Sequence, residues 1–398
     1  MRPSATLLSL ALLCSPALIP AGDWPEFRGP GGQGHSPETG LPLEWSETRN
    51  VLWKISVPGR GWSSPAIAQG RIWLTTATGP QLRALSYDAA TGRELSNTVV
   101  LEIPSGAPMH AKNSHASPTP IVEDNRVYVH FGAHGTAALD ASGKLLWTAS
   151  YPHNHVHGTG GSPVVYRDLL IFNCDGGDVQ FVVALDKATG KERWKTNRPG
   201  RTNMAFSTPL IVRAAGRDQL ISPGAHYGVS YDPATGKELW KVAYGDGFSN
   251  VPRPVESHGL IFITTGFYSP ELLALRPDGS LAWKTSRAVP LTPSPIAAGD
   301  EIYMVSDNGI ASCLDARTGR LLWQQRLGGN FSASPIHADG RLYFTNEDGE
   351  TTVIAPGREF RKLASNSLNE TTFASIAVSG GSFYIRTASR LYRIANPR

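Results

Sequence analysis

Short runs of apolar residues recur along the chain, and each run is apolar on both faces of the strand that it would form. The clearest runs are Arg71–Thr75, Val127–Phe131, Leu169–Phe172, Leu260–Ile263 and Leu342–Thr345. A strand that is apolar on both faces must be covered on both faces. Because no amphipathic helical period interrupts the runs, the pattern predicts an all-β chain of stacked sheets.

A hairpin with a repeated turn follows these runs. The clear copies are residues 184–194, 231–240 and 314–323, and looser copies are residues 87–95, 139–147 and 275–283. In most copies an apolar strand ends at Asp, whose side chain can hydrogen-bond to the turn, and Gly supplies the positive φ that closes it. A second strand then ends in Trp. We expect these Trp side chains to pack between neighbouring units.

A proline, in most copies preceded by Ser or Thr, opens a short first strand in each unit, such as residues 66–68 and 296–298. Proline is tolerated at the first residue of a strand. It recurs at intervals of 40 to 53 residues, and Ser375 takes its place in a last unit: Pro65, Pro118, Pro163, Pro209, Pro254, Pro295 and Pro335. Eight four-stranded antiparallel units predict an eight-bladed β-propeller.

The last unit provides only three strands, near residues 375–378, 382–386 and 391–394. Residues 51–57, around Trp53, form a strand of the Trp-bearing type that has no hairpin before it. This strand supplies the missing fourth element. We therefore predict that the N-terminal strand closes the ring and leaves no open sheet edge.

The repeated Asp-x-x-Thr-Gly-Lys-x-x-Trp hairpin resembles the tryptophan-docking repeat of the PQQ-like β-propeller family, and the resemblance covers residues 51–395. The stretch Asp23–Pro30, with Gly61–Pro65, also resembles exported PQQ-like repeat proteins of planctomycetes. More distantly, the repeat is similar to that of quinoprotein dehydrogenases and of the outer-membrane assembly lipoprotein BamB. The resemblance implies the propeller fold, whereas function does not follow from fold.

The chain divides into a signal peptide (residues 1–21), an irregular N-terminal arm (residues 22–50) that packs its aromatic side chains on the body, and the propeller (residues 51–398). The leader has a basic start, a short apolar run and a small residue at Ala21, which favours export to the periplasm or beyond. Leu13 before Cys14 is a poor lipoprotein signal, so simple export is preferred over lipid anchoring. The later cysteines, Cys174 and Cys313, lie in different repeats and are expected to be unpaired.

Composition excludes several partners. The 37 basic and 33 acidic residues include no basic run, so nucleic acid is not expected as a partner. No stretch is long and apolar enough to be predicted as a transmembrane segment. The chain also lacks the adjacent cysteine pair that the resemblance to quinoprotein dehydrogenases would require, and no calcium ligands can be assigned. PQQ is therefore not expected as a cofactor.

Seven of the 11 histidines lie between His110 and His157, in the second and third units. Loops before the first strand and loops between the second and third strands share one face of a propeller. We therefore expect His115, His130 and His157 to face the channel mouth. The candidate ligand-binding residues on this face are His115, His157, His130, His134, Asp175, Asp178, Trp62, Asn250, Arg253 and Asn330.

Imidazole is also a ligand of transition metals such as Zn²⁺. The candidate metal ligands are His110, His115, His153, His155 and His157, although their spacing matches no closed zinc motif. The same groups could instead hydrogen-bond a sugar, or could satisfy buried backbone groups.

The sequence favours a monomeric binding or scaffolding protein that lacks catalysis and binds a small molecule, a glycan or an envelope protein at the channel mouth. One alternative is a metal- or quinone-dependent enzyme. The other is an interaction module that resembles BamB and acts in envelope assembly.

Overall fold

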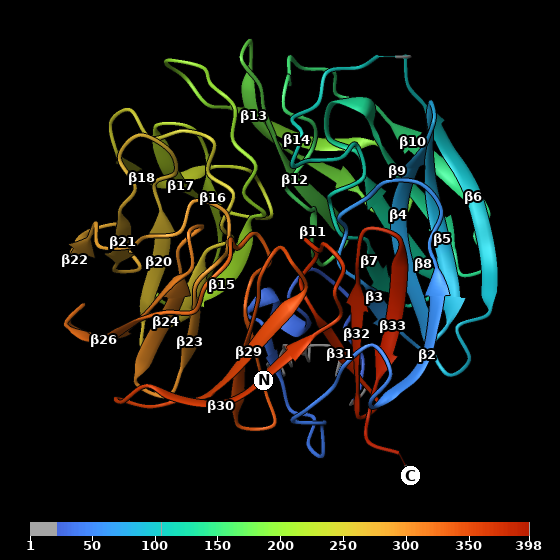
Figure 1. Cartoon of the computed structure of the whole chain (residues 1–398). Helices are drawn as coiled ribbons and strands as arrows, with labels where there is room; N and C mark the ends of the chain where they lie inside the picture. Colours follow the sequence, from blue (N-terminus) through green and yellow to red (C-terminus); the bar gives the residue numbers. More distant parts are fainter. Residues whose placement is uncertain (1–21, 105, 398) are drawn as a thin grey trace, which may run out of the picture.

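The computed structural model describes residues 22–104 and 106–397, which form eight antiparallel sheets around a common axis (Figure 1). The predicted all-β, eight-bladed propeller is confirmed. Its described helices are two single 3₁₀ turns, η1 (Pro30–Gly32) and η2 (Gly132–His134). Within the described residues no helix is long and apolar enough to cross a membrane.

Each blade runs from an inner to an outer strand. Blades 1 to 4 comprise β3 (Ala66–Ala68), β4 (Arg71–Thr78), β5 (Gln81–Asp88) and β6 (Glu94–Glu102); β7 (Ile121–Glu123), β8 (Arg126–His130), β9 (Thr136–Asp140) and β10 (Leu145–Ala149); β11 (Val164–Tyr166), β12 (Leu169–Asp175), β13 (Gln180–Asp186) and β14 (Glu192–Asn197); and β15 (Leu210–Ala214), β16 (Arg217–Pro223), β17 (Tyr227–Tyr231) and β18 (Glu238–Ala243).

Blades 5 to 8 follow the same order. They comprise β19 (Val255–Ser257), β20 (Leu260–Thr264), β21 (Leu272–Leu275) and β22 (Leu281–Thr285); β23 (Ile296–Ala298), β24 (Glu301–Val305), β25 (Ile310–Asp315) and β26 (Leu321–Arg326); β27 (Ile336–Ala338), β28 (Arg341–Thr345), β29 (Glu350–Ala355) and β30 (Arg361–Ser367); and β31 (Ala377–Ser379), β32 (Ser382–Arg386), β33 (Arg390–Ile394) and β2 (Val51–Ser56).

Burial explains why each sheet stacks on its neighbours. The second and third strands are buried along nearly their whole length, whereas outer strands such as β14 are half-buried or exposed. The apolar side chains of adjacent blades form shared cores, as Ile171 and Val182 of blade 3 do with Leu220 and Val229 of blade 4. Each blade face therefore removes its apolar surface from water against the next blade.

The repeated turn is a socket for the Trp of the preceding blade. In blade 3, Asp186 Oδ1 accepts the backbone N–H groups of Ala188 and Thr189, and Gly190 has φ 73°. A Cβ on Gly190 would lie 2.6 Å from the ring of Trp147, whose Nε1 donates to Lys187 O at 3.2 Å. Trp53, Trp194, Trp240, Trp283 and Trp323 donate to the next turn in the same way. The expected packing role of these Trp residues is confirmed.

The ring closes as predicted. Strand β2 pairs antiparallel with β33, with Lys54 opposite Tyr392, and forms the outermost strand of blade 8. The first and last segments of the propeller therefore share one sheet. Cys174 and Cys313 are both buried and form no disulfide within the part of the chain that the structure describes, as predicted.

The N-terminal arm does more than cover the body, because it crosses the channel. Trp24 is 1% exposed and bridges Ile67 of blade 1, and Pro25 O accepts the N–H of Val122 in blade 2. Farther along, β1 (His35–Ser36) adds to the inner strand of blade 7 in parallel. In Figure 1 this blue segment lies inside the ring. Trp24 and Trp45 are buried, as expected, but the entry of the arm into the channel was not predicted.

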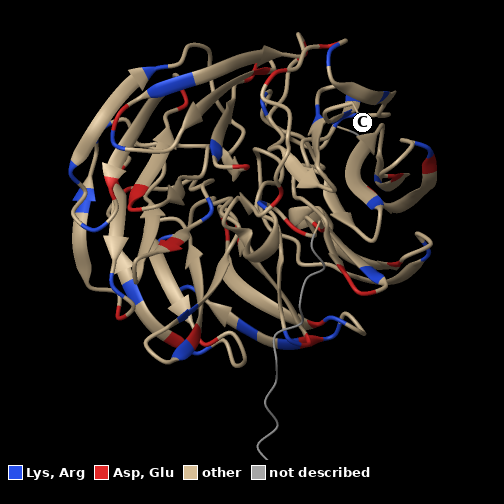
Figure 2. Cartoon of the chain, turned by 90° about the horizontal axis from the view of Figure 1, so that it is seen from below, with Lys and Arg blue, Asp and Glu red and all other residues tan. Residues whose placement is uncertain are grey.

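Charged residues are spread around the outside of the ring. Figure 2 views the chain from below and shows Lys and Arg interspersed with Asp and Glu around the blades. This distribution agrees with the absence of a basic run in the sequence.

Candidate functional site

A cavity of about 490 Å³ opens on the face where the loops before the first strands lie. We call this the cavity face. The lining combines aromatic rings with hydroxyl groups, as is usual for ligand pockets with a few placed polar groups. Its aromatic residues are Phe27, Trp62, Phe206, Phe248, Phe267, Tyr268 and Phe373. Phe27 belongs to the arm, so the arm contributes to the wall of the cavity.

A ring of hydroxyl groups encircles the cavity. In seven blades a Ser or Thr precedes the first strand, and these residues form the hydroxyl ring: Ser64, Thr119, Ser162, Thr208, Ser294, Ser334 and Ser375. Each of six backbone N–H groups donates to the hydroxyl oxygen of the next blade at 2.9–3.0 Å, as Thr119 N does to Ser162 Oγ. The hydroxyls therefore join the inner ends of neighbouring blades.

Blade 5 breaks this ring, because Arg253 stands where the other blades have a hydroxyl. Its backbone N–H still donates to Ser294 Oγ at 2.9 Å. The side chain is only 2% exposed and turns toward the arm, where Nη1 donates to Phe27 O at 2.6 Å and Nη2 pairs with Glu26 at 3.1 Å. Arg253 therefore ties the arm to the propeller.

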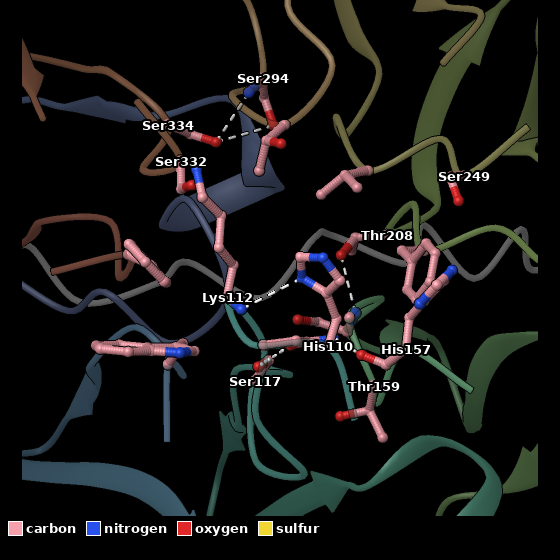
Figure 3. Close-up of a pocket in the computed structure, with 18 of the residues that line it drawn as sticks. His110, Lys112, Ser117, His157, Thr159, Thr208, Ser249, Ser294, Ser332 and Ser334 are labelled. Carbon is pink, nitrogen blue, oxygen red and sulfur yellow. Dashed lines mark hydrogen bonds between the residues drawn. The ribbon is translucent and has the colours of Figure 1, made fainter. Parts of the chain in front are cut away.

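The loops before blades 2 and 3 form a polar wall of the cavity. The rings of His110 and His157 meet edge to face with centroids 5.8 Å apart, and both line the cavity. The side chain of Lys112 extends toward Ser332 (Figure 3), and its Nζ pairs with Glu347 of blade 7 at 2.9 Å. This ion pair links blades on different sides of the mouth.

The structure places only part of the predicted site at the cavity. Of the candidate ligand-binding residues, His157 and Trp62 line it. The expectation that His115 and His130 face the channel mouth is wrong. His115 Nδ1 contacts His134 Nε2 at 3.1 Å, and both rings lie outside the cavity lining. His130 is 2% exposed and packs on Phe172 of blade 3, because the end of β8 turns this side chain toward the neighbouring blade.

The remaining candidates are structural or lie beside the cavity. Asn250 is buried and donates to Thr264 O at 2.9 Å, which fixes the loop before blade 5. Asn330 is exposed and outside the cavity lining. Asp178 is an exposed loop carboxylate that accepts the N–H of Asn154 at 2.7 Å. Arg253 holds the arm, as described above.

Asp175 lies in a second, water-sized cavity of about 20 Å³, which His130, His153 and His155 also line. Among the described residues, neither of its carboxylate oxygens has a hydrogen-bond partner, and Arg198 Nη1 lies 3.6 Å from Oδ2. Burial raises the pKa of Asp175 to about 6. Burial lowers the pKa of His155 to about 3, with smaller contributions from neighbouring histidines. The arrangement keeps these imidazoles neutral.

The candidate metal ligands separate into pairs. His110 faces His157, His153 faces His155, and His115 faces His134. Within the part of the chain that the structure describes, no three His, Cys, Asp or Glu side chains are placed to hold a metal ion.

Sequence reasoning missed most of the cavity lining, although the repeat contains a usable signal. The residue two positions before each ring position also lines the cavity, because alternate residues of an extended segment point to the same side. These residues are Trp62, Ser117, Gly160, Phe206, Val251, Thr292, Ser332 and Phe373. Alignment on the residue directly before each first strand would have identified them, but this residue is Pro120 in blade 2 and Ile376 in blade 8, rather than the predicted Pro118 and Ser375. Phe27, Phe267 and Tyr268 lie outside the repeat and carry no such signal.

The buried histidines predict loss of stability in acid. Burial lowers the pKa of His130 to about 3 from an ordinary value of 6.5. Between these pH values the unfolded chain binds a proton that the folded chain does not, so stability falls as the pH decreases. One such group contributes about 1.4 kcal/mol per pH unit. Asp175 acts in the opposite direction between about pH 6 and 4, because its folded form binds the proton more tightly.

Urea unfolding at pH 7, 6, 5 and 4 checks this prediction. We expect His130→Asn to lower the pH slope of the unfolding free energy by up to about 1.4 kcal/mol per unit. His110→Asn is the control, since His110 is exposed. An unchanged slope in His130→Asn would contradict the assignment of the acid sensitivity to this side chain.

Comparison with known proteins extends these observations. The family model described as "Outer membrane protein assembly factor BamB" matches residues 87–222, 225–312 and 272–389. BamB of Yersinia pestis is 27% identical over 200 residues, which is 44% of this chain and 49% of that protein. BamB of Alteromonas naphthalenivorans is 30% identical over 182 residues, 42% of this chain and 41% of that protein.

A tetrathionate hydrolase of Acidithiobacillus ferrooxidans is 29% identical over 178 residues, 41% of this chain and 34% of that protein. The aligned part of this chain thus spans less than half the length of these curated relatives.

Two solved structures share the fold. BamB of Moraxella catarrhalis superposes with a TM-score of 0.64 at 13% identity and covers 86% of this chain and 99% of its own. Quinohemoprotein alcohol dehydrogenase of Comamonas testosteroni superposes with a TM-score of 0.71 at 12% identity and covers 95% of this chain and 81% of its own. At these identities the likeness concerns fold alone.

Proposed function

The chain belongs to the BamB-like family of PQQ-repeat propellers, and from this premise we propose that it is a binding protein without catalysis that takes an apolar group of an envelope protein into its cavity. The family match supports a role in protein interaction. The relatives' printed name, an outer-membrane assembly factor, supports an exported protein with a partner in the envelope. The leader-like composition of residues 1–21, which lie outside the described residues, agrees with export.

The observation that carries the proposal is an exposed aromatic rim at the cavity. Tyr268 is 80% exposed and Phe267 is 41% exposed, and both line the cavity. Phe248 stacks on Tyr268 with centroids 5.1 Å apart. Large apolar side chains at the mouth of a concave pocket are typical of interaction sites, and aromatic residues dominate binding energy at such sites. Blade stacking does not require these exposed rings.

Binding of a neutral aromatic peptide tests the proposal. The probe is a fluorescein-labelled peptide of alternating Ala and Phe with a C-terminal amide, followed by fluorescence anisotropy. We expect saturable binding that is about tenfold weaker in the Phe248→Ala/Tyr268→Ala variant, because the loss of such aromatic contacts costs about 1.4 kcal/mol or more.

The matched control is Leu281→Ala, which removes an exposed apolar side chain from the outer strand of the same blade. This variant should bind the peptide with unchanged affinity. Absence of saturable binding, or equal weakening by the control, would reject the cavity as the binding site.

A further inference from the structure

Five consecutive hydroxyls of the ring have a proton to donate. The oxygens of these five residues each accept a backbone N–H from the neighbouring blade. Among the described residues none of the five hydroxyls finds an acceptor for its own proton. They belong to blades 8, 1, 2, 3 and 4 and are at most 4% exposed, yet all line the cavity: Ser375, Ser64, Thr119, Ser162 and Thr208. We call these five residues the hydroxyl arc. Buried hydroxyl donors are normally hydrogen-bonded, so we expect the arc to donate to an acceptor inside the cavity.

Of the other blades, blade 6 has one isolated donor of this kind, Ser294, whose Oγ accepts the Arg253 N–H and the Ser334 hydroxyl and has no acceptor for its own proton among the described residues. In blades 6 and 7 the Ser334 hydroxyl donates to Ser294 Oγ at 3.0 Å, so its proton is used within the protein. In blade 5 the position is Arg253, which holds the arm. The five consecutive free donors therefore lie on one side of the cavity. This is the side on which His110, Lys112 and His157 form the wall.

Accepting a backbone N–H makes a hydroxyl a better donor, because hydrogen bonds in a chain polarise one another. An ionised oxygen is the acceptor that such donors bind most strongly. Two or three adjacent hydroxyls could each donate to a different oxygen of one carboxylate or phosphate group. An aromatic wall above them would hold the apolar remainder of the ligand.

The charges around the cavity also favour an anion. No Asp or Glu of the described residues lines it, whereas Lys112, His110 and His157 do. Behind the wall of blade 1, Arg386 is 1% exposed and donates to Ser63 O, Ser63 Oγ and Thr75 O. Among the described residues, Arg386 forms no ion pair. Its charge is therefore uncompensated in a medium where screening is weak.

One carboxylate opposes this field. Glu347 pairs with Lys112 at 2.9 Å and also accepts the hydroxyl of Ser332 at 2.7 Å. It lies outside the cavity lining and neutralises the charge of Lys112. An anion bound on the arc would compete with Glu347 for the Lys112 ammonium group.

We infer that the arc of free hydroxyls binds an oxyanion group, carboxylate or phosphate, at the end of an apolar ligand. The inference rests on the proposed binding function and deepens it, since it names the chemical group that the cavity recognises. A partner's carboxylate and a free phosphate both present negatively charged oxygen atoms to the arc.

Two probes that differ in one group test the inference. The Ala-Phe peptide described above is compared as its C-terminal carboxylate and as its C-terminal amide at neutral pH. We expect the carboxylate form to bind at least about tenfold more tightly, as for a hydrogen-bonded ion. Ser162→Ala should reduce this preference to about threefold or less and leave the affinity for the amide unchanged.

Ser334→Ala provides the matched control. Ser162 and Ser334 occupy the same position in their blades, and each accepts one backbone N–H, from Thr119 and Ser294 respectively. Both variants lose that structural hydrogen bond, but only Ser162 has a free proton. Equal affinity of the native chain for the two peptides, or an equal loss of preference in Ser334→Ala, would overturn the assignment of the donors.

A test with inorganic phosphate distinguishes a free phosphate from a partner's carboxylate as the bound group. It also distinguishes failure of the oxyanion site from failure of the proposed peptide-binding function. Melting temperatures are compared in phosphate and in chloride at equal ionic strength, because a ligand of the folded state raises the melting temperature. Stabilisation that Ser162→Ala removes, without binding of either peptide, would support the oxyanion site and reject the aromatic-peptide function. No stabilisation together with equal peptide affinities would reject the oxyanion site and leave the aromatic rim intact.

Discussion

Replacing β2 (Val51–Ser56) by a Gly-Ser linker of equal length is expected to lower the melting temperature by about 10 °C and to make the protein self-associate. The linker removes the outermost strand of blade 8 and exposes the edge of β33, which can then pair with another chain. It also removes Trp53 and Ile55, which pack against the core shared by blades 8 and 1. Two such side chains contribute about 4 kcal/mol, before the lost backbone pairing is counted.

Differential scanning calorimetry and light scattering check this prediction. Leu52→Ser is the matched control, because Leu52 is 46% exposed on the same strand and points away from the core. It should leave both the melting temperature and the molecular mass unchanged. A linker variant that remains monomeric and as stable as the native chain would show that β2 does not close the ring.

The substitution Arg253→Ser is expected to release the arm even though it restores a hydroxyl to the ring. The variant loses the hydrogen bond to Phe27 O and leaves Glu26 without its ion-pair partner. Breaking a buried ion pair by removing one partner costs about 3–5 kcal/mol. Hydrogen exchange should therefore accelerate at the amides that the arm holds, such as Ile67, Val122 and His337.

Two comparisons make the result specific to the arm. The double variant Glu26→Gln/Arg253→Ser should recover part of the lost stability, because no uncompensated carboxylate remains. Ser334→Ala alters the ring without touching the arm and should leave exchange at Ile67 and Val122 unchanged. Native protection of these amides in Arg253→Ser would mean that the arm is held by its other contacts.

The repeat predicted most of the fold because each blade repeats the same local chemistry. Residues 66–68, 296–298 and 382–386 were predicted as strands and match β3, β23 and β32. Ring closure also followed from counting, since an incomplete blade and an unpaired strand could satisfy only each other. The strands within a blade depend on residues that are near in sequence, and ring closure depends on a fourth strand that blade 8 lacks.

The site was less predictable because it is built from exceptions to the repeat. Tyr268 and Phe27 come from a loop and from the arm, which have no equivalent in other blades. The histidine cluster gave the correct side of the ring, and His157 lines the cavity. His130 belongs to the same cluster in the sequence, but the pleat of β8 directs its ring onto Phe172 of blade 3. Proximity in sequence located the blades, whereas the direction of a side chain depends on its place in the pleat.

Arg253 illustrates what a closer comparison of repeats can reveal. Seven blades place a hydroxyl at this position, and one places a guanidinium group. When one repeat has a different residue at a position that makes the same hydrogen bond in every other repeat, that residue indicates an interaction that only this blade makes. Here that contact is with the arm.

The pairing of the first segments with the last has a consequence for the time course of folding. Trp45 N donates to Asn366 Oδ1 across 321 positions, and β2 must find β33 near the other end of the propeller. Contacts between residues so distant in sequence form slowly, because a long loop must first be closed. During synthesis the arm and β2 are made before the blades, whereas their partners Asn366 and β33 are made after the first six blades. Blade 8 is therefore the final blade to assemble, and until β33 has been synthesised β2 lacks its partner strand and can pair with other chains.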